Sequence, residues 1–305
     1  MNSLPPTWLT TTSALFMVGL LAACASNPAQ VSQQRFNDIL ASPERSAADR
    51  TNDIRRKPEH LLPFMGLRPG MVALDVVAGG GYTTELLARS IGPTGTVYSQ
   101  SQARDASRPT SPPAAPEGQS HPNLAPVAPV APVTAPVTAP VTAPVATPAT
   151  APRTSPIMVA ERDAKLRAAN VASAKIVTVV QRFDNPVPEA VANAGLDIVT
   201  LMFNYHDLGH MGVDRDAMNR AIYRGLKSGG VYVIGDHAGR PGTGISEAGT
   251  LHRIDEAFLR AEVERAGFKL AAEGQFLRNL ADPRDKNTPH PPMPKDEFVF
   301  RFVKP

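Results

Sequence analysis

Short apolar runs alternate with helical patterns along most of this chain. Residues 71–77 form one such run, bounded by Pro69-Gly70 before it and by three glycines after it. A continuous apolar run of this length is typical of a parallel strand that is buried on both faces. Comparable runs predict further strands over residues 96–99, 175–180, 197–203, 231–235, 268–273 and 297–303. Helical patterns separate them and are predicted over residues 50–64, 84–90, 161–169, 214–226 and 254–266.

This alternation predicts an α/β protein with a Rossmann-like, doubly wound sheet. The strand at 71–77, the glycine turn, the helix at 84–90 and the strand at 96–99 make a βαβ unit, whose crossover is right-handed. The last two predicted strands follow one another with no helical pattern between them. They therefore predict an antiparallel hairpin at the C-terminus.

Residues 101–156 break the pattern, because proline, alanine, valine and threonine dominate them. The chain has 31 prolines, well above the usual ~5%, and many lie in this segment. Such a segment buries too little side chain to offset its ordering entropy, so we predict a disordered insert. A linker between two domains is excluded, since neither side alone completes a sheet. Residues 43–100 and 157–305 are therefore predicted to form one domain, and deleting Ala103 to Arg153 is expected to change its melting temperature by only a few degrees.

The N-terminus carries an apolar stretch over residues 8–23 that ends in Leu21-Ala22-Ala23-Cys24. This ending resembles the bacterial lipobox, in which the cysteine is lipidated and becomes the mature N-terminus. The resemblance implies a signal peptide over residues 1–24 and a membrane-anchored protein of the cell envelope that faces the periplasm. The polar stretch that follows predicts a tether over residues 25–42, although residues 31–40 could form a short helix. No Lys or Arg precedes the apolar stretch, so an uncleaved anchor or a misassigned start codon, with a cytoplasmic protein, stays open.

Charge and cysteine content narrow the function classes. The net charge is +3 without a long basic run, so no nucleic-acid partner is expected. Cys24 is the only cysteine, which excludes an intramolecular disulfide and a zinc site built on cysteines.

The turn after the first predicted strand carries the first motif, Leu74-Asp75-Val76-Val77-Ala78-Gly79-Gly80-Gly81-Tyr82. Glycines let a backbone approach a ligand and adopt positive φ, and a helix N-terminus offers free N–H groups. In its βαβ context this motif resembles that of class I S-adenosylmethionine-dependent methyltransferases. The resemblance implies S-adenosylmethionine as cofactor, and it implies cofactor contacts at Asp75, Ala78, Gly79, Gly80 and Gly81.

Two positions depart from the pattern of this family. Val77 stands where the first glycine is usual, and Gln100 stands where an acidic residue binds the ribose hydroxyls. An amide can take this place, but without the charge-assisted strength of a carboxylate.

Further motifs lie at 203–207, 226–230, 236–237 and 251–255. With the glycine turn they resemble a bacterial group of predicted methyltransferases that often carry signal peptides. The resemblance covers residues 43–100 and 157–305. The C-terminal hairpin agrees with it, because this hairpin distinguishes the methyltransferase version of the fold from the dehydrogenase version.

Polar side chains follow the fourth and fifth predicted strands, where open α/β sheets bind ligands. Asn204 is expected to contact the cofactor. His206 is the first candidate for a general base, oriented by Asp207 or Asp236. We expect acceptor contacts from the remaining candidates, His237, Tyr205, His252 and Asp255. A metal site is not expected, because His206, Asp207, His210, Asp236, His237 and His252 show no compact ligand spacing.

The sequence thus predicts methyl transfer from S-adenosylmethionine to an unidentified small molecule. The main alternative is a non-catalytic envelope lipoprotein that keeps the fold and binds a small ligand, which Val77 and Gln100 favour. A nicotinamide-dependent oxidoreductase is less favoured, because the missing ribose carboxylate affects it equally. Export also separates the protein from S-adenosylmethionine, which is made in the cytoplasm.

Overall fold

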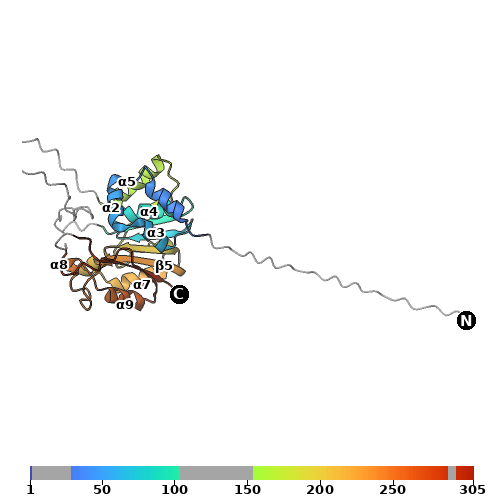
Figure 1. The fold of residues 1–305 in the computed structure, drawn as a ribbon. Coiled ribbons are helices and arrows are strands. Elements are labelled where there is room, and N and C mark those ends of the chain that lie inside the picture. The colour runs from blue at the N-terminus through green and yellow to red at the C-terminus, as the bar shows by residue number, and fades with distance from the viewer. Residues whose placement is uncertain (2–28, 104–153, 288–292) are drawn as a thin grey trace, which may run out of the picture.

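The computed structural model describes Met1 and residues 29–103, 154–287 and 293–305 (Figure 1). The predicted signal peptide with Cys24, and most of the predicted insert, lie outside these residues. Across the described part of the chain, no helix combines the length and apolar character needed to cross a membrane.

Seven strands form one sheet in the order β3-β2-β1-β4-β5-β7-β6. Strand β7 runs opposite to the other six described strands: it lies between β5 and β6 and pairs antiparallel with both. The predicted α/β class, the doubly wound sheet and the C-terminal antiparallel pair are therefore confirmed. The strands are β1 (Val72–Val76), β2 (Thr96–Ser101), β3 (Lys175–Val180), β4 (Leu196–Met202), β5 (Leu226–His237), β6 (Lys269–Gly274) and β7 (Glu297–Val303).

Helices cover both faces of the sheet, with α2 to α5 above it and α7 and α9 below it in Figure 1. Alternate residues of one strand enter two separate cores: Ala73 packs into the first and Leu74 into the second. This explains why the strands are apolar at successive positions. The longer helices are α1 (Gln33–Ala41), α2 (Ala47–Arg56), α3 (Pro58–Met65), α4 (Tyr82–Ile91), α5 (Ser155–Ala168), α7 (Arg215–Gly225) and α9 (Glu256–Arg265). Shorter ones are η1 (Glu189–Val191), α6 (Tyr205–His210) and α8 (Ala248–Leu251).

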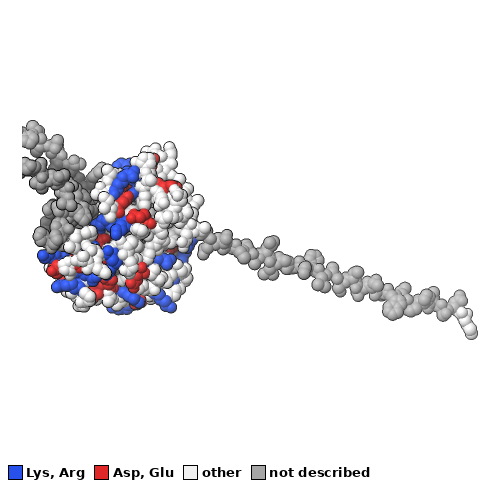
Figure 2. Space-filling view, in the orientation of Figure 1, with Lys and Arg blue, Asp and Glu red and all other residues white. Residues whose placement is uncertain are grey.

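The N-terminal part agrees with one alternative and adds a helix. Within the expected tether, the short helix allowed over residues 31–40 is α1, and its Phe36 and Ile39 are buried in the first core. The helix predicted with Pro58 in its first turn is α3, and Lys57 in a left-handed conformation (φ 43°) separates it from α2. On the face shown in Figure 2, Lys and Arg side chains lie among Asp and Glu.

Candidate functional site

The glycine turn between β1 and α4 forms one side of a cleft at the carboxyl end of the sheet. Gly79 (φ 54°) and Gly81 (φ 81°) take the positive φ that favours glycine. The cleft has a volume of about 310 Å³, which falls in the range of small-molecule sites. Its lining residues are Asn52, Arg56, Asp75, Val77, Ala78, Gly79, Gly80, Tyr82, Thr83, Arg162, Met202 and Asn204.

Asp75 lies near the end of β1, at the floor of the cleft. Its Oδ2 accepts a hydrogen bond from the hydroxyl of Thr84 (2.7 Å) and its Oδ1 one from the hydroxyl of Thr200 (2.8 Å). Burial raises the pKa of Asp75 to about 6, although both hydroxyls oppose the shift. The floor of the cleft is thus a carboxyl group that is held on two sides.

Gln100, predicted to stand where an acidic residue binds the ribose hydroxyls, instead supports the backbone of the glycine turn. Its side chain is fully buried; Oε1 accepts from the backbone N–H of Val77 (3.1 Å), and Nε2 donates to the carbonyl of Gln181 (2.8 Å). Both ends of the amide are therefore used by the backbone, and Gln100 is not among the residues that line the cleft. Val77 itself has a φ of 55°, so a β-branched residue occupies the left-handed conformation where the family has glycine.

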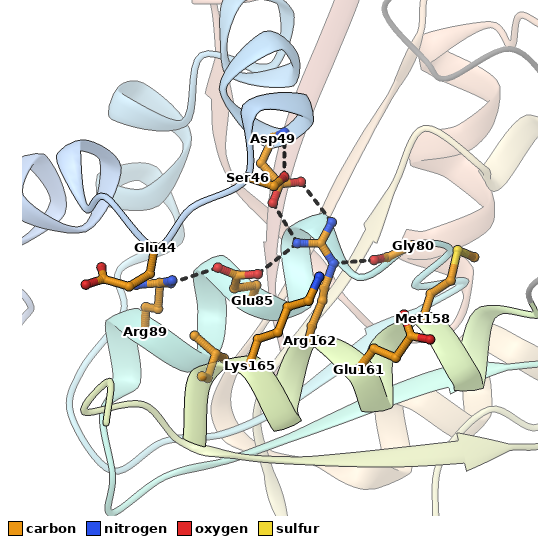
Figure 3. Close-up of a pocket in the computed structure, with 11 residues that line it drawn as sticks. Glu44, Ser46, Asp49, Gly80, Glu85, Arg89, Met158, Glu161, Arg162 and Lys165 are labelled. Atoms are coloured by element: carbon orange, nitrogen blue, oxygen red, sulfur yellow. Dashed lines mark hydrogen bonds and ion pairs between the residues drawn. The ribbon is translucent and has the colours of Figure 1, made fainter. Parts of the chain in front are cut away.

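Helix α5, which follows the predicted insert, fastens the glycine turn to two other helices (Figure 3). The guanidinium of Arg162 donates to both carboxylate oxygens of Asp49 on α2 (2.6 and 2.8 Å) and to Glu85 on α4 (2.8 Å). It also donates to the carbonyl of Gly80 (2.5 Å). Gly81 lies directly beneath α5: an added Cβ would meet Arg162 at 3.0 Å. The predicted contact residue Gly81 thus packs against a helix.

Helix α2 closes the cleft from above, and sequence analysis missed its contribution. Asn52 and Arg56 both line the cleft and are four residues apart, so they share one face of α2. The guanidinium of Arg56 lies 4.7 Å from the ring centroid of Phe203 and 5.2 Å from that of Tyr82. Asn52 and Arg56 could have been identified from the sequence, because polar residues four apart lie on one face of a helix that precedes the first strand.

Beyond β4 and β5, a second polar group of side chains surrounds His206. The ring is buried, and its Nδ1 lies 2.6 Å from Oδ1 of Asp236, while its backbone N–H donates to Oδ2 of Asp236 (2.9 Å). The other ring nitrogen, Nε2, lies 3.2 Å from Oδ1 of Asp207. Burial opposes the charge, but the two carboxylates outweigh it and raise the pKa of His206 to about 10. With both nitrogens facing carboxylates, His206 has no open nitrogen for the predicted role of general base.

Two further histidines lie against this ring. His252 directs Nδ1 to Oδ1 of Asp207 (2.9 Å), and its ring meets that of His206 edge-on. His237 lies between His206 and Phe203. Burial lowers the pKa of His237 well below its ordinary value, so this ring is neutral at physiological pH. Its Nδ1 is 3.0 Å from Oε1 of Glu297 but is not aligned for a hydrogen bond.

Two predicted acceptor contacts take structural positions instead. Tyr205 is fully buried; its hydroxyl donates to Glu262 (3.0 Å) and accepts from Asn219 (2.9 Å), which ties α6 to α7 and α9. Asp255 caps the N-terminus of α9 and accepts from the backbone N–H of Gly242 (2.7 Å).

No family model matches the chain, and no curated protein matches it. Several solved structures are similar in fold. A SAM-dependent methyltransferase from Aquifex aeolicus is 14% identical, with a TM-score of 0.46 over 86% of this chain and 100% of that one. A S-adenosylmethionine-dependent methyltransferase from Clostridium acetobutylicum is 10% identical (TM-score 0.43; 88% and 96% covered), and the [4+2]-cyclase SpnF is 15% identical (TM-score 0.47; 91% and 98% covered). Likeness at this level indicates neither an activity nor a substrate.

Proposed function

We propose that this protein binds S-adenosylmethionine in the cleft at the glycine turn and transfers its methyl group to a small-molecule acceptor. The observation that carries the proposal is the cleft itself. It combines a glycine turn, a buried carboxyl group at the end of β1 and a cationic side chain from α2 in one 310 Å³ space. It lies outside the carboxyl ends of parallel strands, where this type of sheet binds ligands.

The residues of the cleft fit the cofactor. A Cβ added to Gly80 would meet no atom within 4 Å, so the absent side chain leaves room for a ligand against the turn. Arg56 offers a positive charge for the cofactor's carboxylate, and Asp75 offers an acceptor for its polar groups. Asn204 lines the same cleft at the end of β4, as the sequence analysis expected for a cofactor contact.

When bound, the cofactor supplies an electrophilic methyl group on a sulfonium. The protein holds the acceptor atom in line with this methyl group, and its contribution to the rate of transfer comes mainly from this orientation. Arg162 and Gln100 hold the turn from two sides and so fix the position of the ligand. Because His206 is held between two carboxylates, we assign it no proton transfer in the form of the site seen here.

The test is a calorimetric titration with S-adenosylmethionine and with its demethylated product. We expect micromolar binding, about 8 kcal/mol. Gly80→Asn places a side chain in the cleft and is expected to weaken binding at least tenfold. Gly229→Asn is the matched control, because Gly229 lies outside the lining residues and its φ of 75° is one that Asn tolerates. Absence of binding at millimolar ligand contradicts the proposal.

A non-catalytic protein that binds a small ligand is the second candidate, and the buried amide of Gln100 favours it. It predicts ligand binding in the titration but no release of demethylated cofactor when acceptors are supplied. Turnover with any acceptor excludes it.

We further propose that Cys24 carries a lipid and anchors the protein in the cell envelope. The sequence Leu21-Ala22-Ala23-Cys24 supports this. Cells fed labelled palmitate should yield labelled protein in the membrane fraction, and Cys24→Ser should abolish the label. Unlabelled wild-type protein in the cytoplasmic fraction contradicts it.

A further inference from the structure

We propose that His206, Asp207 and His252 form a binding site for one divalent transition-metal ion of the zinc or iron(II) type. His206 and Asp207 lie on α6, which follows β4, and His252 ends α8, in the segment that follows β5. One ligand atom from each, Nε2 of His206, a carboxylate oxygen of Asp207 and Nδ1 of His252, lies within 4.8 Å of the others. The role of this ion in methyl transfer rests on the proposed function, whereas its binding does not.

The distances fit a shared ion. Oδ1 of Asp207 is 3.2 Å from Nε2 of His206 and 2.9 Å from Nδ1 of His252. Metal–ligand bonds of about 2.0–2.2 Å around a single ion place neighbouring ligand atoms roughly 3 Å apart. Two imidazole nitrogens and one carboxylate oxygen are a ligand set for zinc and for non-haem iron(II), and both leave further coordination positions open.

The surroundings of His206 match those of a metal-binding histidine. Such a ligand usually directs its other ring nitrogen to a carboxylate, which fixes the ring and the tautomer. Asp236 provides this carboxylate at 2.6 Å from Nδ1, and it is itself held by the backbone N–H groups of His206 and His237 (2.9 and 2.8 Å). Asp236 is fully buried, so its position is set before any ion arrives.

The loop that carries His252 is also fixed. His252 is the C-cap residue of α8 and takes a left-handed conformation (φ 50°), which histidine tolerates better than most residues. After it, Ile254 pairs with Ala238 at the end of β5. Helix α8 packs closely on α6 at Gly249, where an added Cβ would lie 2.4 Å from His210. These contacts place His252 beside Asp207.

The site is reachable from solvent on one side. His206 is buried, but the side chains of Asp207 and His252 are 34% and 44% exposed. An ion held here has its protein ligands on one side and its open positions on the other. Those positions suit an oxygen, nitrogen or sulfur atom of the acceptor, so we infer that the acceptor class includes metal-coordinating groups.

Cobalt(II) is the probe, because its visible absorption reports the number and type of its ligands. The full-length chain is purified without a polyhistidine tag, stripped with a chelator and titrated with Co²⁺, without cofactor or acceptor. We expect saturation at one Co²⁺ per chain and release of the cobalt by Zn²⁺. His252→Asn and Asp207→Asn, both at partly exposed positions, should each weaken binding at least tenfold.

His60→Asn is the matched control, because His60 is an exposed histidine on α3 and lies outside the ligand group. It should bind Co²⁺ like the wild type. Asp236→Asn tests a positioning residue, and it should lower the affinity 10- to 100-fold while one Co²⁺ still binds. Thermal melts without metal verify that each variant folds.

The proposal is overturned if the wild type shows no saturable Co²⁺ binding, or if His252→Asn and Asp207→Asn bind as tightly as His60→Asn. Neither result bears on cofactor binding in the cleft, which the Gly80→Asn titration tests separately. Conversely, a failure to bind the cofactor does not affect the interpretation of the Co²⁺ titration.

Discussion

At the scale of single residues, Asp75 is a buried carboxyl group that accepts hydrogen bonds from two hydroxyls. Its pKa of about 6 lies above the ordinary 3.8, so the unfolded chain releases this proton at lower pH than the folded protein. The folded state therefore loses stability as the pH rises from about 4 to 6. The burial that shapes the cleft floor thus opposes folding at neutral pH.

Asp75→Asn removes this titration. Between pH 4.5 and 7.5, we expect the unfolding free energy of the variant to rise relative to that of the wild type by roughly 2 kcal/mol. Urea denaturation at both pH values measures it. A difference that stays constant with pH would show that Asp75 ionises normally.

The left-handed backbone conformation of Val77 leads to a second prediction at the scale of residues. A β-branched residue at φ 55° is strained by about 1–2 kcal/mol, whereas glycine there costs about 0.5–1 kcal/mol in chain entropy. The Val77 side chain is only partly buried against the second core, so its loss offsets part of this gain. Val77→Gly should therefore change the unfolding free energy by less than about 1 kcal/mol. Val76→Gly, one residue earlier in β1, should lower it by several kcal/mol, because Val76 is buried in the second core. Equal losses of unfolding free energy in Val77→Gly and Val76→Gly would contradict backbone strain at Val77.

At the scale of elements, α5 is fastened through Arg162 to a carboxylate that is almost fully buried. Arg162→Met leaves Asp49 without this partner, and removing one member of a buried pair costs about 3–5 kcal/mol. We expect a loss of roughly 3 kcal/mol in denaturant unfolding. Arg220→Met breaks an exposed pair with Asp216 on α7 and should cost less than about 1 kcal/mol. A loss for Arg162→Met as small as that for Arg220→Met would mean that α5 is held by its apolar contacts alone.

Most helices and strands were predictable because each follows from a hydrophobic pattern within a short stretch of the sequence. The strand predicted at 297–303 agrees with β7, and the end of β1 at the glycine turn follows from the run 71–77. The pairing of His252 with Asp207 was not predictable, since 45 residues separate them and the loop path decides their distance. Arg162 was missed for a similar reason: its partners Asp49 and Glu85 precede the insert, while Arg162 follows it.

At the scale of the whole molecule, every strand and helix of the described fold lies outside residues 104–153. Replacing these residues with a short Gly-Ser linker should therefore change the melting temperature by only a few degrees. Differential scanning calorimetry of the two chains tests this. A drop of more than about 10 °C, several kcal/mol for a domain of this size, would assign the insert a part in the core.

The position of β7 has a consequence for how the protein is made. Strand β7 follows β6 along the chain but lies between β5 and β6 in the sheet, and it brings Glu297, the partner of Arg55 on α2. Until β7 has been synthesised, β6 has no β7 to pair with and β5 keeps an open edge on that side. Such edges invite pairing with other chains. The sheet is thus complete only once β7 has been synthesised, and a chain that ends before Glu297 lacks the strand that pairs with both β5 and β6.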